Sequence, residues 1–140
     1  ANKDKTDLEL ALDYAREQNT ADILILTALG GRLDQTFANV FLLAQKNRSQ
    51  TRIQIKSENV LIQVVTAHQS ITLNPPLNSQ LSLLPLSEVV HIKTLSGVKW
   101  TLKDETLHRG QTRGISNITA KESITFQLGQ GICLLTVEFA

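Results

Sequence analysis

Two glycines, an arginine and a carboxylate follow one another in a stretch whose residue types could hold an anion. The stretch is GGRLDQTFANVFLL, residues 30–43, and it comes directly after an apolar run. Glycine tolerates positive φ and lets backbone approach a ligand, and the N–H groups that open a helix attract negative charge. Arg32 could hold a phosphate through two hydrogen bonds, and Asp34 suits a metal ion or a hydroxyl. The simpler alternative is that Gly30 and Gly31 only make a turn, while Asp34 favours the helix dipole.

A second group of oxygen-bearing side chains stands at the start of the sequence, in KDKTD. Asp4 and Asp7 flank Thr6 at the entry to an expected helix. Carboxylates placed in this way can share a Mg²⁺ ion, which prefers oxygen ligands and keeps several waters. The structural alternative is that Thr6 caps the helix and Asp7 stabilises its first turn.

The third group lies in HRGQTRGISN, residues 108–117, where Arg109, Arg113, Ser116 and Asn117 crowd a glycine-rich connection between expected strands. Serine and asparagine could hydrogen-bond a small polar heterocycle. The alternative is an ordinary solvated loop between strands.

The remaining reactive residue types form no recognisable site. His68, His91 and His108 have no ligand spacing with one another or with Cys133. We expect the histidines to be ordinary surface or strand residues and Cys133 to pack as a small apolar side chain. The sequence contains no G-x-S-x-G, Walker A or G-x-G-x-x-G motif.

Composition narrows the class of protein. The 140 residues are 41% apolar and 19% charged, with a net charge of +1, which argues against a general nucleic-acid or anionic-membrane surface. No apolar run approaches the roughly 20 residues needed to span a bilayer, and the first ten residues lack a signal-peptide core. One cysteine excludes an internal disulfide and a cysteine zinc cluster. These features suit a cytoplasmic protein.

The residues up to about 57 alternate helix and strand. Residues 6–18 carry a helical stripe of Leu8, Ala11, Leu12 and Ala15, and Thr6 with Glu9 forms a capping box. The apolar run ADILILTA, residues 21–28, predicts a strand buried on both faces, as in a parallel sheet. A second helical stripe consists of Leu33, Phe37, Val40, Phe41 and Ala44. TRIQIKS, residues 51–57, alternates with period two and predicts another strand.

From about residue 57 onward, short runs with β character alternate with turn signals. Strands are expected at 60–66, 70–73, 80–86, 89–95, 98–102, 124–128 and 132–139, with turns that include KDE at 103–105. This spacing is typical of an all-β sandwich or barrel. The fold class expected is therefore α/β followed by all-β: a partial doubly wound α/β unit over residues 1–57 and a C-terminal β-sandwich over 58–140.

The first segment is short for a complete α/β domain. A sheet of two strands covered by two helices leaves open edges and little core. We therefore expect that the chain is a fragment or that another chain completes the sheet.

Taken together, five segments resemble the thiamine pyrophosphokinase family in their order and spacing, over nearly the whole chain: KDKTDLELAL, GGRLDQTFANVFLL, SLLPLS, GVKWTLKDETL and RGISN. The resemblance implies an α/β catalytic domain, a β-sandwich that binds thiamine, and a homodimer with thiamine clefts between subunits. The implied reaction moves a pyrophosphoryl group from ATP to the hydroxyl of thiamine, gives thiamine diphosphate and AMP, and requires Mg²⁺.

The resemblance also implies roles for residues near the nucleotide. Asp7 would be a residue of the Mg²⁺ or phosphate site, with Asp4 and Thr6 near the nucleotide. Arg32, following Gly30 and Gly31, would steady the triphosphate.

Further implied roles concern the thiamine end of the reaction. Asp34 would face the metal ion or the thiamine hydroxyl, and Gln35 and Asn39 would lie beside that pocket. Ser116 and Asn117 would meet the thiamine ring, from the neighbouring subunit.

The sequence departs from the family pattern in three places. Gln35 stands where bacterial relatives usually carry histidine, and Trp100 stands where tyrosine is common. An aspartate-rich GDxDS-type motif, which binds Mg²⁺ and phosphate in the family, has no counterpart in this sequence. We therefore expect a truncated catalytic domain that binds Mg²⁺-ATP poorly.

Two other functions remain compatible with the same residues. One is a non-catalytic regulatory module that binds thiamine or thiamine diphosphate. The other is a purely structural dimerisation domain that binds no ligand.

Overall fold

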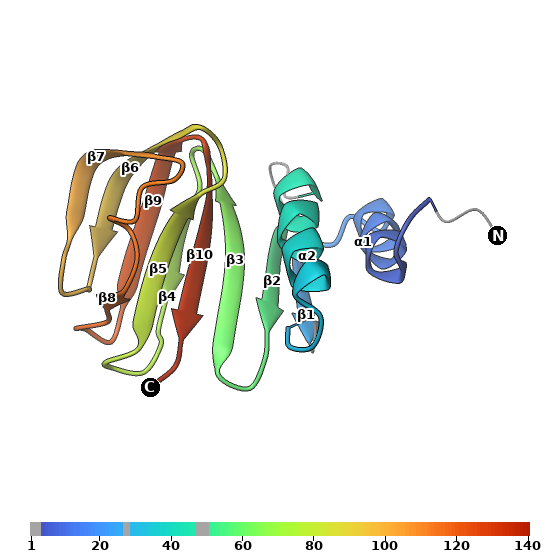
Figure 1. Cartoon of the computed structure of the whole chain (residues 1–140), viewed down its shortest axis with the longest axis horizontal. Coiled ribbons are helices and arrows are strands. Elements are labelled where there is room, and N and C mark those ends of the chain that lie inside the picture. Colours follow the sequence, from blue (N-terminus) through green and yellow to red (C-terminus); the bar gives the residue numbers. More distant parts are fainter. Residues whose placement is uncertain (1–3, 27–28, 47–50) are drawn as a thin grey trace.

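The computed structural model describes residues 4–26, 29–46 and 51–140, and in these ranges the chain forms two helices and ten strands (Figure 1). The first elements are α1 (Asp7–Glu17), β1 (Asp22–Leu26), α2 (Leu33–Lys46) and β2 (Arg52–Lys56). Eight strands follow: β3 (Val60–Thr66), β4 (Ser70–Leu73), β5 (Gln80–Pro85), β6 (Val89–Ser96), β7 (Leu102–His108), β8 (Asn117–Ile118), β9 (Ile124–Gln130) and β10 (Ile132–Glu138). None of the helices in these ranges is long and apolar enough to cross a membrane.

The strands form two sheets. The larger sheet has the order β1-β2-β3-β10-β5-β8, and the smaller has the order β4-β9-β6-β7. β1 and β2 are parallel, whereas β2 pairs antiparallel with β3 and all later pairs are antiparallel. The expected fold class is confirmed: an α/β portion is followed by a β-sandwich. The larger sheet continues across the domain boundary expected between residues 57 and 58. That boundary stays a prediction.

Each face of the larger sheet contributes to a separate core. Alternate residues of a strand point to opposite faces, so β3 gives Val65 to the core between the sheets and Ile62 and Val64 to the core under the helices. Leu12 of α1 and Leu43 of α2 belong to this second core. Figure 1 shows the two helices beside β1 and β2, away from the smaller sheet.

The expectation that the first strand is buried on both faces is wrong. Leu24 and Leu26 of β1 are 54% and 61% exposed, whereas Ile23 and Ile25 pack against the helix-side core. β1 is the edge strand of the larger sheet, and nothing in the described part of the chain covers its second face. A continuous apolar run shows that both faces of a strand can be buried. It does not show that a helix or a second sheet covers each face.

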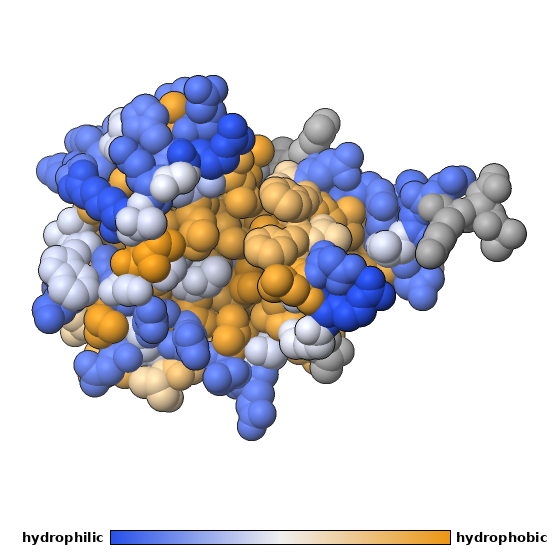
Figure 2. All heavy atoms as spheres, viewed as in Figure 1, coloured by the Kyte–Doolittle hydropathy of each residue, from blue (hydrophilic) through white to orange (hydrophobic). Residues whose placement is uncertain are grey.

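The apolar stripe expected for α2 is also largely wrong. Val40 is buried, but Phe37 and Phe41 are 55% and 62% exposed, and Leu33 is exposed as well. The helix carries apolar residues on two adjacent faces, and it buries the face with Val40 and Leu43. Figure 2 shows the result as a broad apolar surface that runs from the helix region across the middle of the molecule.

In α1 the helix and its Thr6 cap are confirmed, with Leu12 buried and Ala11 exposed.

Two expectations for the sandwich need correction. A strand was expected at residues 98–102, but residues 98–101 contain only an isolated bridge, between Val98 and Thr119. β7 begins at Leu102 and contains the KDE segment that predicted a turn. Among the described strands β7 is an edge strand beside β6, and charged residues on an edge discourage unwanted pairing. The two-residue strand β8 was not predicted, because its length gives no periodic pattern.

Candidate functional site

The glycine pair makes a turn into α2, as the sequence predicts. Gly30 and Gly31 have φ values of +94° and +89°, and a Cβ at either position would meet open space. Glycine is therefore favoured at these positions because of the positive φ, and not because a side chain would lack space. α2 begins two residues later, at Leu33.

Arg32 and Asp34 form an exposed two-point ion pair at this turn. The Nε atom of Arg32 lies 3.1 Å from Oδ1 of Asp34, and a terminal nitrogen lies 2.5 Å from Oδ2. The Arg32 guanidinium lowers the pKa of Asp34, and the backbone N–H of Gln35 also donates to this carboxylate at 2.9 Å. Arg32 has five N–H donors, and three of them have no partner among the described residues. A second anion can therefore bind Arg32 without first displacing Asp34.

The residues that precede α1 adopt the geometry of a helix cap. The hydroxyl of Thr6 accepts a hydrogen bond from the backbone N–H of Glu9 at 3.2 Å, and Asp7 lies in the first turn. Asp4 and Asp7 are exposed. Across the described ranges, no three His, Cys, Asp or Glu side chains come close enough to hold a metal ion together. As they stand, these carboxylates do not form a complete Mg²⁺ site.

A hollow of about 450 Å³ between α1 and α2 brings two of the predicted residues together. Thr6 and Asn39 both line it, alongside Phe41 and Gln45. Its walls come from the N-terminus of one helix and the middle of the other, so the packing of α1 on α2 determines its shape.

Charged side chains hold α1 against α2. The ammonium of Lys46 lies 2.7 Å from Oδ1 of Asp13 and 3.4 Å from Glu9, and Lys5 lies 2.7 Å from the other oxygen of Asp13. Hydrogen bonds from Lys46 and Lys5 lower the pKa of Asp13 to about 2. The same contact raises the pKa of Lys5.

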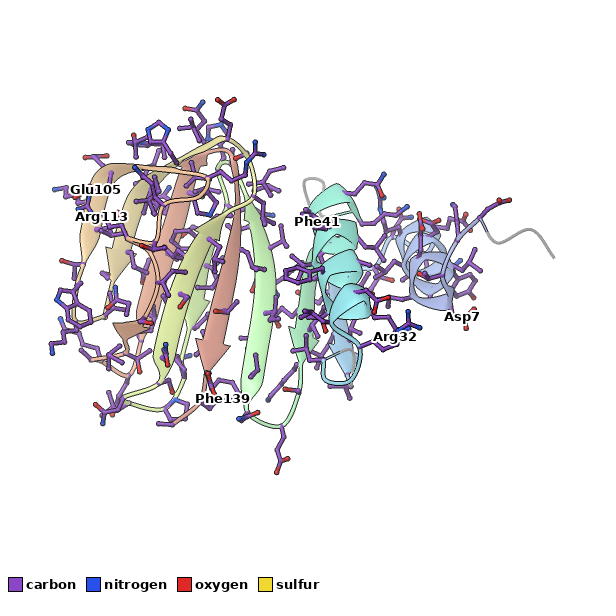
Figure 3. All side chains as sticks on the ribbon, in the orientation of Figure 1. Asp7, Arg32, Phe41, Glu105, Arg113 and Phe139 are labelled. Carbon is purple, nitrogen blue, oxygen red and sulfur yellow. The ribbon has the colours of Figure 1, made fainter. Side chains whose placement is uncertain are left out.

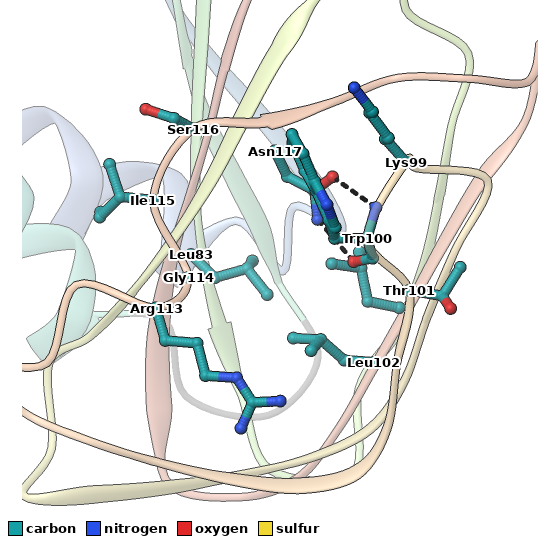
Figure 4. A pocket seen from close by; sticks show the side chains of 11 residues that line it. Leu83, Lys99, Trp100, Thr101, Leu102, Arg113, Gly114, Ile115, Ser116 and Asn117 are labelled. Atoms are coloured by element: carbon teal, nitrogen blue, oxygen red, sulfur yellow. Dashed lines mark hydrogen bonds between the residues drawn. The ribbon is translucent and has the colours of Figure 1, made fainter.

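A second and larger pocket, of about 640 Å³, opens in the sandwich (Figure 4). Its lining consists of Leu83, Leu95, residues 99–102 and residues 113–117. Three leucines give it an apolar floor, and polar groups surround the mouth. An apolar cavity with a few convergent polar groups is the usual form of a small-molecule site.

The segment with Ser116 is fastened to β5. The backbone N–H of Leu83 donates to the carbonyl of Gly114 at 2.8 Å, and the N–H of Ser116 donates to the hydroxyl of Ser82 at 3.0 Å. Ser116 has a φ of +64°, which is uncommon for a residue other than glycine and is often found at functional positions. Its own hydroxyl is exposed and accepts a hydrogen bond from Gln80 at 2.9 Å.

Asn117 is placed differently from Ser116, although both line the pocket. It is only 8% exposed, and its amide bonds to the backbone N–H and the carbonyl of Trp100. The sequence predicts Asn117 as a ligand contact, whereas the structure gives most of its hydrogen-bonding capacity to the protein itself.

Trp100 is the pocket residue that sequence reasoning missed as a site residue. Its side chain is 54% exposed, and the ammonium of Lys99 lies 4.7 Å from the centre of its ring system. A lone tryptophan in a short segment after a glycine, SGVKW, is the pattern that could have revealed it.

At the pocket rim Arg113 pairs with Glu105 through contacts of 2.6 and 2.9 Å.

The two groups of predicted residues lie far apart within one chain. Figure 3 shows Asp7 and Arg32 at the helical end and Arg113, which lines the sandwich pocket, at the opposite end. One copy of the chain therefore does not bring the glycine turn to Ser116 and Asn117.

His91 and Cys133 take the strand positions that the sequence predicts. His91 lies on the smaller sheet, 3.7 Å from Asp104 and 3.5 Å from the Thr106 hydroxyl. Cys133 is fully buried in the core between the sheets, and burial raises the pKa of its thiol to about 12.

Comparison with known proteins assigns a family model to each part of the chain. Residues 1–55 match the model described as thiamin pyrophosphokinase, catalytic domain. Residues 68–133 match the model described as thiamin pyrophosphokinase, vitamin B1 binding domain. The first match contains the glycine turn, and the second contains all the residues that line the sandwich pocket.

Individual relatives agree with these models. The chain is 32% identical to the thiamine pyrophosphokinase of Bacillus subtilis over 96% of its own length and 63% of the relative's. It is 30% identical to thiamine pyrophosphokinase 2 of Arabidopsis thaliana over 90% of its own length and 50% of the relative's. The chain thus spans between half and two thirds of the length of these curated relatives.

Solved structures give the same result for the fold. The crystal structure of the Bacillus subtilis thiamine pyrophosphokinase superposes with a TM-score of 0.88 at 30% identity, over 99% of this chain and 65% of that one. That of the Geobacillus thermodenitrificans thiamin pyrophosphokinase superposes with a TM-score of 0.85 at 35% identity, over 100% of this chain and 64% of that one.

Proposed function

The chain belongs to the thiamin pyrophosphokinase family, and from this we propose that the protein transfers a pyrophosphoryl group from ATP to thiamine, giving thiamine diphosphate and AMP. One observation carries the proposal. The catalytic and vitamin-binding family models match consecutive parts of the chain, and each match coincides with one of the two candidate sites. The two parts are proposed as the domains 1–57 and 58–140.

The glycine turn and Arg32 are proposed to bind the phosphates of ATP. The N–H donors that Arg32 does not give to Asp34 are suited to phosphate oxygens, and the positive end of the α2 dipole favours an anion at the same place. In the reaction the thiamine hydroxyl oxygen forms a bond to the β-phosphorus as the bond between that phosphorus and the AMP oxygen breaks, and the hydroxyl proton is released. Positive charge from Arg32 would offset the negative charge on the transferred group.

Asp34 is proposed to face the thiamine hydroxyl or the metal ion. Its carboxylate is held by Arg32, so phosphate binding at Arg32 would also fix the position of Asp34. Asp7 is proposed to assist at the Mg²⁺ or phosphate site. Mg²⁺ typically binds through one or two carboxylates together with substrate phosphates, so the ion would be held jointly with ATP.

Four further side chains are assigned to the surroundings of these groups. Asp4 and Thr6 would lie near the nucleotide, and Gln35 and Asn39 beside the thiamine hydroxyl. The hollow shared by Thr6 and Asn39 supports this grouping, because it links the start of α1 to the middle of α2.

The sandwich pocket is proposed to take the ring end of thiamine that carries no charge. Lys99 lines the pocket, and its positive charge disfavours the cationic thiazolium ring, whereas the charge of Arg113 is offset by Glu105. The aminopyrimidine ring can stack on Trp100 and hydrogen-bond at Ser116. The thiazolium ring and its hydroxyl arm would then point out of the pocket.

A homodimer is proposed to bring the two sites together. Within one chain the glycine turn and the sandwich pocket lie at opposite ends, so the hydroxyl arm needs a catalytic end from a second copy. The exposed Phe37 and Phe41 and the apolar surface in Figure 2 support such an interface. We place the protein in the cytoplasm, where thiamine and ATP are both available.

The test is turnover with thiamine, ATP and Mg²⁺, followed through the fluorescent oxidation product of thiamine diphosphate. Product above a no-protein control, lost in Asp34→Ala, supports the proposal. Thiamine binding without product would fit either a catalytic domain that lacks the GDxDS-type motif or a non-catalytic binding module. Absence of both would contradict the proposed function.

A further inference from the structure

We propose that Asn117 is a positioning residue: its side-chain amide fixes the backbone of Trp100, so that the indole forms a preset wall of the pocket, and it does not itself bind the substrate. The inference rests on the proposed thiamine pocket and assigns a new role within it. It separates Asn117 from its neighbour Ser116, although the two residues are adjacent in the sequence and line the same cavity.

The hydrogen bonds of Asn117 are the first argument. The Oδ1 atom accepts from the backbone N–H of Trp100 at 3.1 Å and from that of Ile118 at 2.9 Å. The Nδ2 atom donates to the carbonyl oxygen of Trp100 at 2.7 Å, and Figure 4 shows the two bonds to Trp100. An amide offers two acceptor positions and two N–H donors, so only one donor is left for any ligand. Burial of the residue further limits access to that donor.

The backbone around Trp100 explains why such a contact is needed. Lys99 donates its N–H to the carbonyl of Ile118 at 2.8 Å, and Val98 forms an isolated bridge with Thr119. The backbone of Asn117 is paired with Leu81 of β5 instead. The backbone of Trp100 therefore has no strand residue opposite it. The side-chain amide of Asn117 takes that place and bonds to both the N–H and the carbonyl of Trp100.

The consequence for the site is a tryptophan held in place before a ligand arrives. The side chain of Trp100 is half exposed, with Lys99 beside its ring, so side-chain packing alone constrains it weakly. Fixing its backbone lowers the ordering cost of binding a flat ring. Ser116, by contrast, has an exposed hydroxyl that a ligand can reach.

Trp100 is the one tryptophan in the sequence, so its fluorescence reports this contact directly. In the ligand-free chain, Asn117→Ala and Asn117→Asp are expected to shift the emission maximum and to increase acrylamide quenching. The aspartate variant keeps the acceptor for the N–H of Trp100 but places an oxygen against its carbonyl oxygen where the amide donated, so its change should be at least as large as that of the alanine variant. Ser116→Ala is the matched control, and it should leave both signals as in the wild type.

Thiamine affinity supplies the second measurement. We expect Asn117→Asp to weaken binding about tenfold in the wild-type background and by less than about twofold in a Trp100→Ala background. Ser116→Ala should weaken binding in both backgrounds. If one of the two asparagine variants does not fold by circular dichroism, the other supplies both measurements.

Two outcomes would overturn the inference. One is an unchanged Trp100 spectrum in the asparagine variants. The other is a loss of affinity in Asn117→Asp that is equally large without the indole, because a direct ligand contact predicts that result. If the spectra change but the wild type binds no thiamine, the proposed function is wrong and the contact between Asn117 and Trp100 stands.

Discussion

Lys46 near the end of α2 and Asp13 in the middle of α1 form an ion pair with 2.7 Å between the ammonium and a carboxylate oxygen. The pair joins residues 33 positions apart in the sequence. Because the α1–α2 hollow has walls on both helices, this contact helps to keep Thr6 and Asn39 side by side.

The docking of α1 should therefore depend on pH at the acidic end. The pKa of Asp13 is lowered to about 2, below its ordinary value of about 4. The ionised carboxylate therefore stabilises the packing of α1 on α2 fully above about pH 4, and this stabilisation is lost as the pH falls through 2. Amide exchange of α1, corrected for the intrinsic pH dependence, should show less protection at pH 2 than at pH 5. Lys46→Met should reduce this difference, and an undiminished difference in that variant would contradict the assignment.

Arg32 should matter for nucleotide binding, whereas a comparable surface arginine should not. Arg32→Ala removes the donors proposed for phosphate, so affinity for Mg²⁺-ATP should fall by about tenfold or more. Arg52→Ala is the control, because Arg52 is also an exposed arginine paired with an aspartate, Asp22, at 2.7 Å. Isothermal titration of both variants makes the comparison, and equal effects would argue against a phosphate site at the glycine turn.

Two glycines with the same backbone preference should differ in their tolerance of alanine. Gly97 and Gly110 have φ values of +82° and +93°, but a Cβ at Gly97 would overlap the carbonyl oxygen of Ser123, whereas Gly110 faces open space. Gly110→Ala should lower the free energy of unfolding by about 1 kcal/mol, and Gly97→Ala by about 3 kcal/mol or more. Urea denaturation measures both values. Similar losses would mean that the segment after β6 relaxes around the added methyl group.

The exposed aromatic residues of α2 should control self-association. Phe37→Asp together with Phe41→Asp places charge on the apolar surface, and we expect the proposed dimer to dissociate at micromolar concentration because charge at an apolar interface is poorly solvated. Leu77→Asp serves as the control, since Leu77 is similarly exposed but lies in the sandwich loop between β4 and β5. Sedimentation velocity distinguishes monomer from dimer. A dimer that persists in the double variant would place the interface elsewhere.

Local patterns were sufficient where a short stretch of sequence fixes its own structure. The Thr6 cap, the positive φ of Gly30 and Gly31, and the alternation in β2 follow from residue type and period. The patterns were insufficient where burial depends on distant elements. Phe37 and Phe41 have helical spacing, yet α2 turns its other apolar face inward because of how it lies on β3.

The candidate site shows the same division. The motif around Arg32 and the pocket position of Ser116 could be expected from the sequence. The roles of Trp100 and Asn117 depend on two segments that meet only after the sandwich forms, so no local pattern could pair them. Whether Asp34 acts at a metal ion or a hydroxyl stays a prediction.

The place of β10 has a consequence for synthesis of the protein. β10 lies between β3 and β5 in the larger sheet, yet residues 132–138 follow every other strand in the sequence. While the chain emerges from the ribosome, the half of the sheet that carries the glycine turn and the half that carries the sandwich pocket have no shared hydrogen bonds. The two halves join only when this last strand is inserted between them, so nascent chains expose two unpaired strand edges until then. A chain whose synthesis stalls or ends before β10 should therefore aggregate, because its two halves cannot join into one sheet.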